Sequence, residues 1–148
     1  MGEQLSRADE LGRLEQEVGV LIRRVKRVIG ERARAVHPDL QPASYLMLSY
    51  LTISGPQRSS VLSERFGVDK GAISRQVQHL CELGLLERTP DPEDGRAALV
   101  SASADAVRRM EAINRDRRRW LAEQLAGWSE ADLRDFVNGL ARYNDALD

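Results

Sequence analysis

The sequence has few of the features by which secreted and membrane proteins are recognised. It contains one cysteine, Cys81, so an intramolecular disulfide is excluded. No apolar run reaches the roughly 20 residues that a membrane-spanning helix needs. The first residues, MGEQLSRADELGR, lack the apolar core of a signal peptide. We therefore expect a cytoplasmic protein that has no membrane partner.

The chemistry of an enzyme or of a cofactor site is also missing from the sequence. The two histidines, His37 and His79, fall in different predicted elements, and no Cys/His cluster has the spacing of metal ligands. There is no glycine-rich phosphate-binding loop and no serine within a nucleophile-elbow motif. We therefore predict that the protein is not an enzyme and has no catalytic residue, no metal site and no cofactor.

The sequence also has few aromatic residues and a small net charge. Aromatics make up 5% of the 148 residues, hydrophobic residues 42% and charged residues 30%, which is typical of one helix-rich domain with an aliphatic core. The formal net charge of −1 argues against a protein that coats nucleic acid indiscriminately. A specific DNA-binding surface needs only a few basic residues on one face, so this class of function stays open.

The most informative part of the sequence is residues 58–103, which predict two short helices followed by a hairpin. Ser59 or Ser60 can cap the first helix, and Gly67 can end it, because glycine enters the left-handed conformation at little cost. Asp69 can then cap the second helix, where its carboxylate accepts hydrogen bonds from free backbone amides. Two helices across a tight turn are typical of a helix-turn-helix.

The second of these helices has two chemically different faces. The apolar residues have the spacing of a core-facing stripe: Ile73, Val77, Leu80 and Cys81. The opposite face carries side chains that we predict to contact DNA: Lys70, Gly71, Ser74, Arg75 and Gln78. Arginine can bind a guanine edge through two hydrogen bonds, and glutamine can pair with adenine. An exposed helix of any soluble protein is also polar, so this face alone does not establish DNA binding.

The hairpin that follows strengthens the DNA-binding interpretation. Residues 85–88 and 97–100 have strand character, and the segment between them, TPDPEDGR, is rich in turn-forming residues. A two-stranded ribbon directly after the second helix is typical of a wing. Arg96 would project from its tip, since the negative potential of a narrow minor groove attracts arginine.

The run DKGAISRQVQHLCELGLLERTPDPEDGRAALVSAS resembles the recognition helix and wing of the MarR family of bacterial transcription regulators. The resemblance implies a winged-helix homodimer that binds a palindromic operator and is commonly released by small phenolic or other hydrophobic ligands. The sequence departs from the family pattern at Gln76, where an apolar residue is usual. This departure bears on the packing and the base contacts of the helix.

The resemblance also implies roles for single residues. Ser74 and Arg75 would contact the major groove, and Arg96 would contact the minor groove. Asp94 would brace Arg96 through an ion pair. Ser60, at the start of the preceding helix, completes the set that we predict to bind DNA.

Helices are predicted on both sides of this region. The first nine residues are polar, and we expect them to be frayed. Residues 10–36 have the apolar spacing of a helix that packs against other helices. Pro42 can start a second, almost wholly apolar helix. Ser103 can cap the next helix, and Ser129, with Asp132 three residues later, resembles the capping box of a last helix.

We therefore predict a mostly α fold with a small two-stranded β-wing, in a single domain over residues 1–148. Residues 42–103 would form the winged helix-turn-helix that binds DNA. Helices over about 10–36 and 104–147 would form the dimerisation region, because their apolar surface exceeds what one small core can cover. A plain amphipathic core helix is the alternative for the N-terminal segment.

Two alternatives to a ligand-responsive repressor stay open. The winged helix could be a protein-interaction module without an operator of its own. Alternatively, Cys81 could sense oxidants, although its position beside Leu80 favours a packed, inert thiol. A ligand pocket can be placed only near His37, Tyr45 and Met47, whose side chains suit a core equally well. No motif encodes the operator, the regulated genes, the effector or the sign of regulation.

Overall fold

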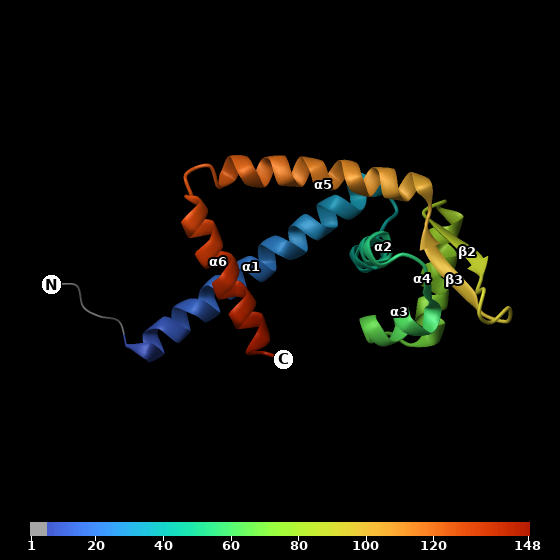
Figure 1. Ribbon diagram of the computed structural model, residues 1–148, viewed down its shortest axis with the longest axis horizontal. Helices are drawn as coiled ribbons and strands as arrows, with labels where there is room; N and C mark the ends of the chain where they lie inside the picture. Colours follow the sequence, from blue (N-terminus) through green and yellow to red (C-terminus); the bar gives the residue numbers. More distant parts are fainter. Residues whose placement is uncertain (1–5) are drawn as a thin grey trace. The chain divides into compact units, whose positions relative to one another are not determined.

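The computed structural model describes residues 6–148, which form six helices and a small sheet (Figure 1). The helices are α1 Arg7–Val36, α2 Pro42–Ser54, α3 Ser59–Phe66, α4 Lys70–Glu82, α5 Ala104–Gln124 and α6 Glu130–Asp145. The strands are β1 Gln57–Arg58, β2 Leu86–Pro90 and β3 Ala98–Ala102. Of the described residues, those from 6 to 113 form one compact unit, and Asn114–Asp148 form a second. In the part that the structure describes, no helix is long and apolar enough to cross a membrane.

The wing belongs to a three-stranded antiparallel sheet with the order β1-β3-β2. β2 and β3 are antiparallel, and Arg88 lies opposite Val100. Both strands begin one residue later and end two residues later than the sequence predicted. The two predicted strands of the wing form as β2 and β3. The sheet also has a third strand that the sequence did not predict, because Gln57 and Arg58 of β1 add to the other edge of β3. A strand of two residues is too short to show an alternating pattern. Its pairing depends instead on the path of the chain from α2 to α3.

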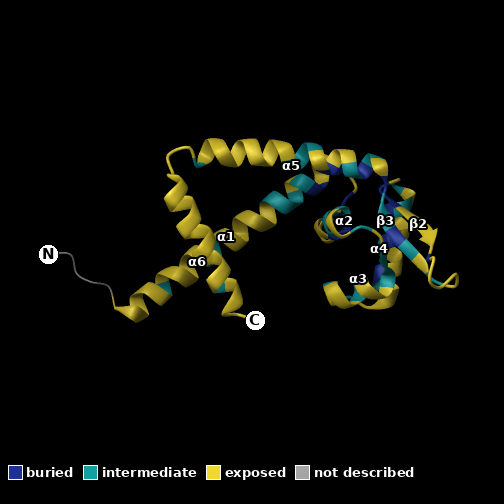
Figure 2. Cartoon of the chain, viewed as in Figure 1, coloured by how far each residue is buried: buried dark blue, intermediate teal, exposed yellow. Residues whose placement is uncertain are grey.

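The hydrophobic core lies where α2, α3, α4 and the sheet meet the last turns of α1 and the first turns of α5. Figure 2 shows the buried positions gathered in these elements, while α6 and the N-terminal half of α1 are mostly exposed. α2, which the sequence predicted to be almost wholly apolar, buries one face only. Met47 and Leu48 are buried, but Leu46 is 43% and Ile53 is 84% exposed. A single helix at the side of a core offers only one face to it.

Most helix ends lie where the sequence predicted them. Asp69 caps α4, its Oδ1 accepting a hydrogen bond from the Ala72 amide at 2.9 Å. Ser103 caps α5, and Ser129 forms the predicted capping box at the start of α6. Gly67 ends α3 in the left-handed conformation, with φ of +61°. Local cap chemistry therefore fixes the boundaries of the helices around the wing.

α3 begins differently from the prediction. Neither Ser59 nor Ser60 caps the helix, because both lie inside it and Arg58 holds the cap position without a side-chain hydrogen bond to the helix. Arg58 is also the last residue of β1, and its backbone is extended, with φ of −70° and ψ of 147°. The strand therefore leads directly into the helix and sets its first residue.

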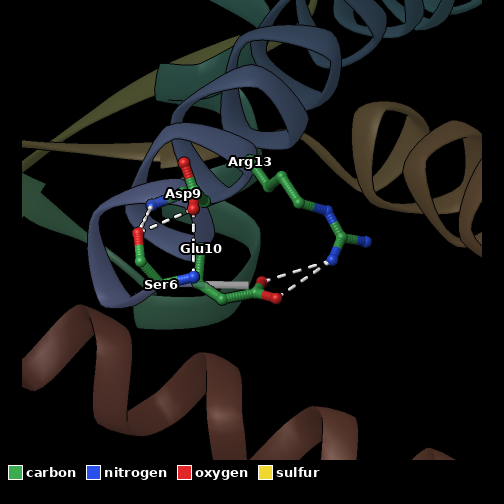
Figure 3. A network of polar contacts seen from close by, with 4 residues as sticks. All are labelled: Ser6, Asp9, Glu10 and Arg13. Carbon is green, nitrogen blue, oxygen red and sulfur yellow. Dashed lines mark hydrogen bonds and ion pairs between the residues drawn. The ribbon is translucent and has the colours of Figure 1, made fainter. Parts of the chain in front are cut away.

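α1 begins earlier than predicted, at a capping box shown in Figure 3. The Asp9 amide donates to Ser6 Oγ at 3.2 Å, and the Ser6 amide donates to Asp9 Oδ2 at 3.0 Å. The expectation of fraying is therefore wrong for residues 6–9, while residues 1–5 lie outside the described residues. The Ser-x-x-Asp spacing here is the same one that predicted the capping box at Ser129.

One arginine joins the start of α5 to the end of α1. Arg109 Nη1 donates to the carbonyl oxygen of Val36, the last residue of α1, at 2.7 Å. Its Nε lies 2.9 Å from Asp105 Oδ2, one turn earlier in α5. The last carbonyls of a helix lack partners within the helix and carry partial negative charge, so a guanidinium stabilises them.

Replacing Arg109 by methionine should lower the free energy of unfolding by about 1 kcal/mol, because the Val36 carbonyl loses a charged donor that solvent partly screens. Urea unfolding followed by circular dichroism measures this loss. Arg108→Met is the matched control, because Arg108 also forms an ion pair with Asp105, at 3.3 Å. The control should change stability by less than about 0.5 kcal/mol. Equal losses in the two variants would contradict the role of Arg109.

Candidate nucleic-acid interface

α4 presents a polar face to solvent because its apolar row is fully buried. Ile73, Val77 and Leu80 are each 0% exposed. The side chains predicted to contact DNA from this helix are all exposed: Lys70, Gly71, Ser74, Arg75 and Gln78. Gln76 is half-buried at the border between the two faces. The departure from the expected apolar residue therefore leaves both faces intact.

Gly71 keeps side-chain bulk away from the first turn of α4. A Cβ at this position would lie 3.1 Å from Asp69 Oδ1 and 3.4 Å from Arg75 Nη1. The shorter contact would displace the carboxylate that caps the helix. Glycine thus lets the cap and the Arg75 guanidinium occupy the same end of the helix.

The exposed face of α4 is hollowed where β2 passes it. Six side chains line this concavity of about 380 Å³: Ser74, Arg75, Gln78, His79, Glu82 and Arg88. Arg88 Nη1 donates to Gln78 Oε1 at 2.7 Å, and Gln78 Nε2 donates to Glu82 Oε1 at 3.1 Å. Arg88 and Glu82 were not among the site residues predicted from the sequence. Glu82 could have been found from its i+4 spacing to Gln78, whereas the contact of Arg88 depends on how the strand passes the helix.

The tip of the wing is a tight turn that exposes Arg96. The Asp91 amide donates to the Ala97 carbonyl, and the Ala97 amide donates to the Asp94 carbonyl, each at 3.0 Å. The predicted ion pair between Asp94 and Arg96 does not form; Asp94 Oδ1 accepts instead from the Arg96 backbone amide at 3.1 Å. A short aspartate side chain meets the backbone amide two residues on more easily than a guanidinium. Asp94 therefore shapes the turn and leaves the Arg96 side chain exposed.

The ion pair that braces the wing is formed by Asp91 and Arg58. Asp91 is 6% exposed, and its Oδ2 lies 2.5 Å from both Nε and Nη2 of Arg58. The Glu93 amide donates to Asp91 Oδ1 at 2.9 Å. This hydrogen bond and the Arg58 guanidinium lower the pKa of Asp91, whereas burial alone would raise it. The pair joins the end of the hairpin to β1.

The other residues singled out from the sequence lie apart from this concavity. Ser60 is exposed in the first turn of α3. Cys81 is half-buried and packs against the core, as its position on the inward stripe predicted. Tyr45 and Met47 belong to the core. Two of the three residues near which the sequence placed a ligand pocket thus serve packing.

Comparison with known proteins identifies this architecture. A family model described as the MarR family matches residues 39–97, from the loop before α2 into the wing. The HTH-type transcriptional regulator YxaD of Bacillus subtilis is 31% identical over 134 residues, which cover 90% of this chain and 92% of that protein. The chain belongs to the MarR family. The HTH-type transcriptional regulator MT0903.1 of Mycobacterium tuberculosis is equally similar, with 31% identity over 136 residues that cover 90% and 91% of the two chains.

Solved structures share the fold of this MarR-family chain. RV1404 from Mycobacterium tuberculosis superposes with a TM-score of 0.78 at 19% identity, over 99% of this chain and 97% of that one. The crystal structure of MarR gives 0.68 at 21% identity, over 99% and 94%. The predicted family and the mostly α winged-helix fold class are confirmed. As a member of the MarR family, the chain is a DNA-binding transcription regulator and not an enzyme.

Asp91→Asn should remove a pH-dependent part of the stability. The pKa of Asp91 is lowered in the folded chain, so its carboxylate stabilises the fold above the unfolded-state value of about 3.9. This stabilisation is lost as the pH falls through the folded-state pKa. The difference in unfolding free energy between wild type and variant should be constant from about pH 8 to about pH 5 and shrink below about pH 4. Urea unfolding over a pH series measures it, and a difference unchanged down to about pH 2 would refute the role of the ion pair.

Proposed function

We propose that this chain acts as a homodimeric repressor that binds a palindromic operator and releases it when a small hydrophobic or phenolic effector binds. The observation that carries the proposal is the exposed polar row of α4 in the same compact unit as an arginine-tipped wing. α4 enters the major groove, where Ser74, Arg75 and Gln78 meet base edges. Arg96 enters the adjacent minor groove. Lys70, with Ser60 on α3, binds backbone phosphates.

The exposed apolar surface of the terminal helices supports a homodimer. α6 has none of its residues buried, and Phe136 and Val137 are 54% and 55% exposed. Trp128 and Phe136 pack edge to face, with ring centroids 5.6 Å apart, and together present an aromatic surface. On α1, Leu21 and Ile22 are about half exposed, at 48% and 49%. Exposed apolar side chains of this kind, on helices of both units, are typical of an interface, and a second copy of the chain is the occupant that we infer.

A two-fold dimer would also explain a palindromic operator. Each subunit would place one α4 in a half-site, so that the symmetry of the DNA mirrors that of the protein. The half-site centres would lie about 34 Å apart, one turn of the double helix. An effector would weaken binding by favouring a dimer shape in which the two recognition helices have a different spacing.

The thiol-based alternative has less structural support than the ligand-responsive one. A redox sensor needs an exposed thiol with a lowered pKa. Cys81 is half-buried and packs against the core with the apolar face of α4. We therefore assign Cys81 to packing.

Arg75→Ala should weaken binding to the preferred operator by about 1–3 kcal/mol, because a bidentate base contact is lost. Fluorescence anisotropy with a labelled duplex measures the change. Arg108→Ala removes the same charge from an exposed position on α5 and is the matched control. Equal binding by wild type and Arg75→Ala would favour a protein-interaction module over a DNA-reading helix.

Phe136→Asp should convert the dimer into a monomer at micromolar concentration, because a carboxylate would be buried without a partner in the interface. Sedimentation velocity measures the change in mass. Ile53→Asp makes the same chemical change at a position of α2 that is 84% exposed, and it should leave the dimer intact. A wild-type monomer at micromolar concentration, or a Phe136→Asp dimer, would overturn the proposed interface.

A further inference from the structure

The amide of Gln78 is held in one orientation by charged groups on both sides. Its oxygen accepts from the Arg88 guanidinium at 2.7 Å, and its nitrogen donates to the Glu82 carboxylate at 3.1 Å. The flipped orientation would set two donors against each other at Arg88 and two acceptors against each other at Glu82. The direction of the amide therefore follows from the chemistry of its neighbours.

The three residues come from rigid parts of the structure. Gln78 and Glu82 are one turn apart on α4, whose apolar row is fully buried. Arg88 lies in β2, opposite Val100, which is 1% exposed. The backbone at both ends of the contact between Arg88 and Gln78 is therefore held in place by the fold. Arg88 is nevertheless exposed, so it can be replaced without opening the core.

The held amide keeps the groups that reading a base requires. A glutamine amide has two N–H donors and two oxygen lone pairs, and the contacts to Glu82 and Arg88 use one of each. One donor and one lone pair remain, which is the number that pairing with N7 and N6 of adenine in the major groove requires. An amide fixed before binding loses less side-chain entropy when the DNA contact forms.

We propose that Arg88 is a positioning residue of the DNA-reading face, which acts with Glu82 to fix the amide of Gln78 and so sets the base preference of that side chain. The inference rests on the proposed function, because it requires that α4 reads bases. It extends the reading face from α4 to β2. Arg88 affects which base pair is chosen at one position in each half-site, whereas a phosphate contact would affect all sequences alike.

The test compares base preferences by selecting bound duplexes from a randomised DNA library. Gln78→Ala identifies the position that Gln78 reads, because preference there should fall by about fivefold to a hundredfold. Arg88→Ala should lower the preference at that same position and leave the other positions unchanged. The double variant should lose no more than Gln78→Ala alone, as expected for two residues in one chain of contacts. Arg88→Lys keeps a charged donor and should recover part of the preference.

Glu87→Ala is the matched control for the strand. Glu87 precedes Arg88 in β2 and is also exposed, but neighbouring residues of a strand point to opposite faces. This variant should keep the wild-type preference at every position. A second readout needs no DNA: the side-chain amide resonances of Gln78 should shift in Arg88→Ala and stay closer to wild type in Arg88→Lys.

The outcomes separate the inference from the proposed function. If Arg88→Ala weakens all duplexes equally and lowers the salt dependence by about one counterion, Arg88 is a phosphate contact and the inference is wrong. Unchanged base preference, or unshifted Gln78 resonances, also overturns it. If the wild-type protein selects no sequence, the proposed function fails, and the base-reading role of Gln78 fails with it.

Discussion

Burial of one side of α4 is the constraint on which the rest of the molecule depends. Ile73, Val77 and Leu80 are fully buried, so the helix cannot turn about its axis without exposing them. Each such side chain contributes about 1.5–3 kcal/mol, as much as a single base contact or more. The direction of Ser74 and Gln78 is therefore set by the core before any DNA is present.

The wing and α5 are fixed relative to this helix by a few hydrogen bonds at the ends of elements. Ser103 Oγ donates to the Gly84 carbonyl at 2.8 Å, and the Ser103 amide donates to the Leu85 carbonyl at 2.9 Å. These bonds join the start of α5 to the turn that ends α4. The ion pair of Asp91 with Arg58 ties the wing to β1 at the opposite end of the hairpin. The start of α5 is thus joined to the end of α4 by a short connection.

Patterns within one element were predictable from the sequence, and contacts between elements were not. Apolar periodicity and cap residues such as Asp69 and Ser103 place α4 and the start of α5 correctly, because these signals lie within a few residues of each other. The strand at residues 57–58 forms only through pairing with a distant segment. Asp91, rather than Asp94, meets an arginine because the register of the sheet decides which acid faces β1. The contact between Arg88 and Gln78 of α4 was missed for the same reason.

The central claim is that one polar helix face and one arginine-tipped wing are presented to double-stranded DNA in symmetric pairs. Hydroxyl-radical footprinting on the DNA upstream of the gene for this protein tests it most directly. The account predicts protected segments in two half-sites about one helical turn apart, arranged as a palindrome, with minor-groove protection beside each. Uniform protection, or a single unrepeated protected site, would contradict it.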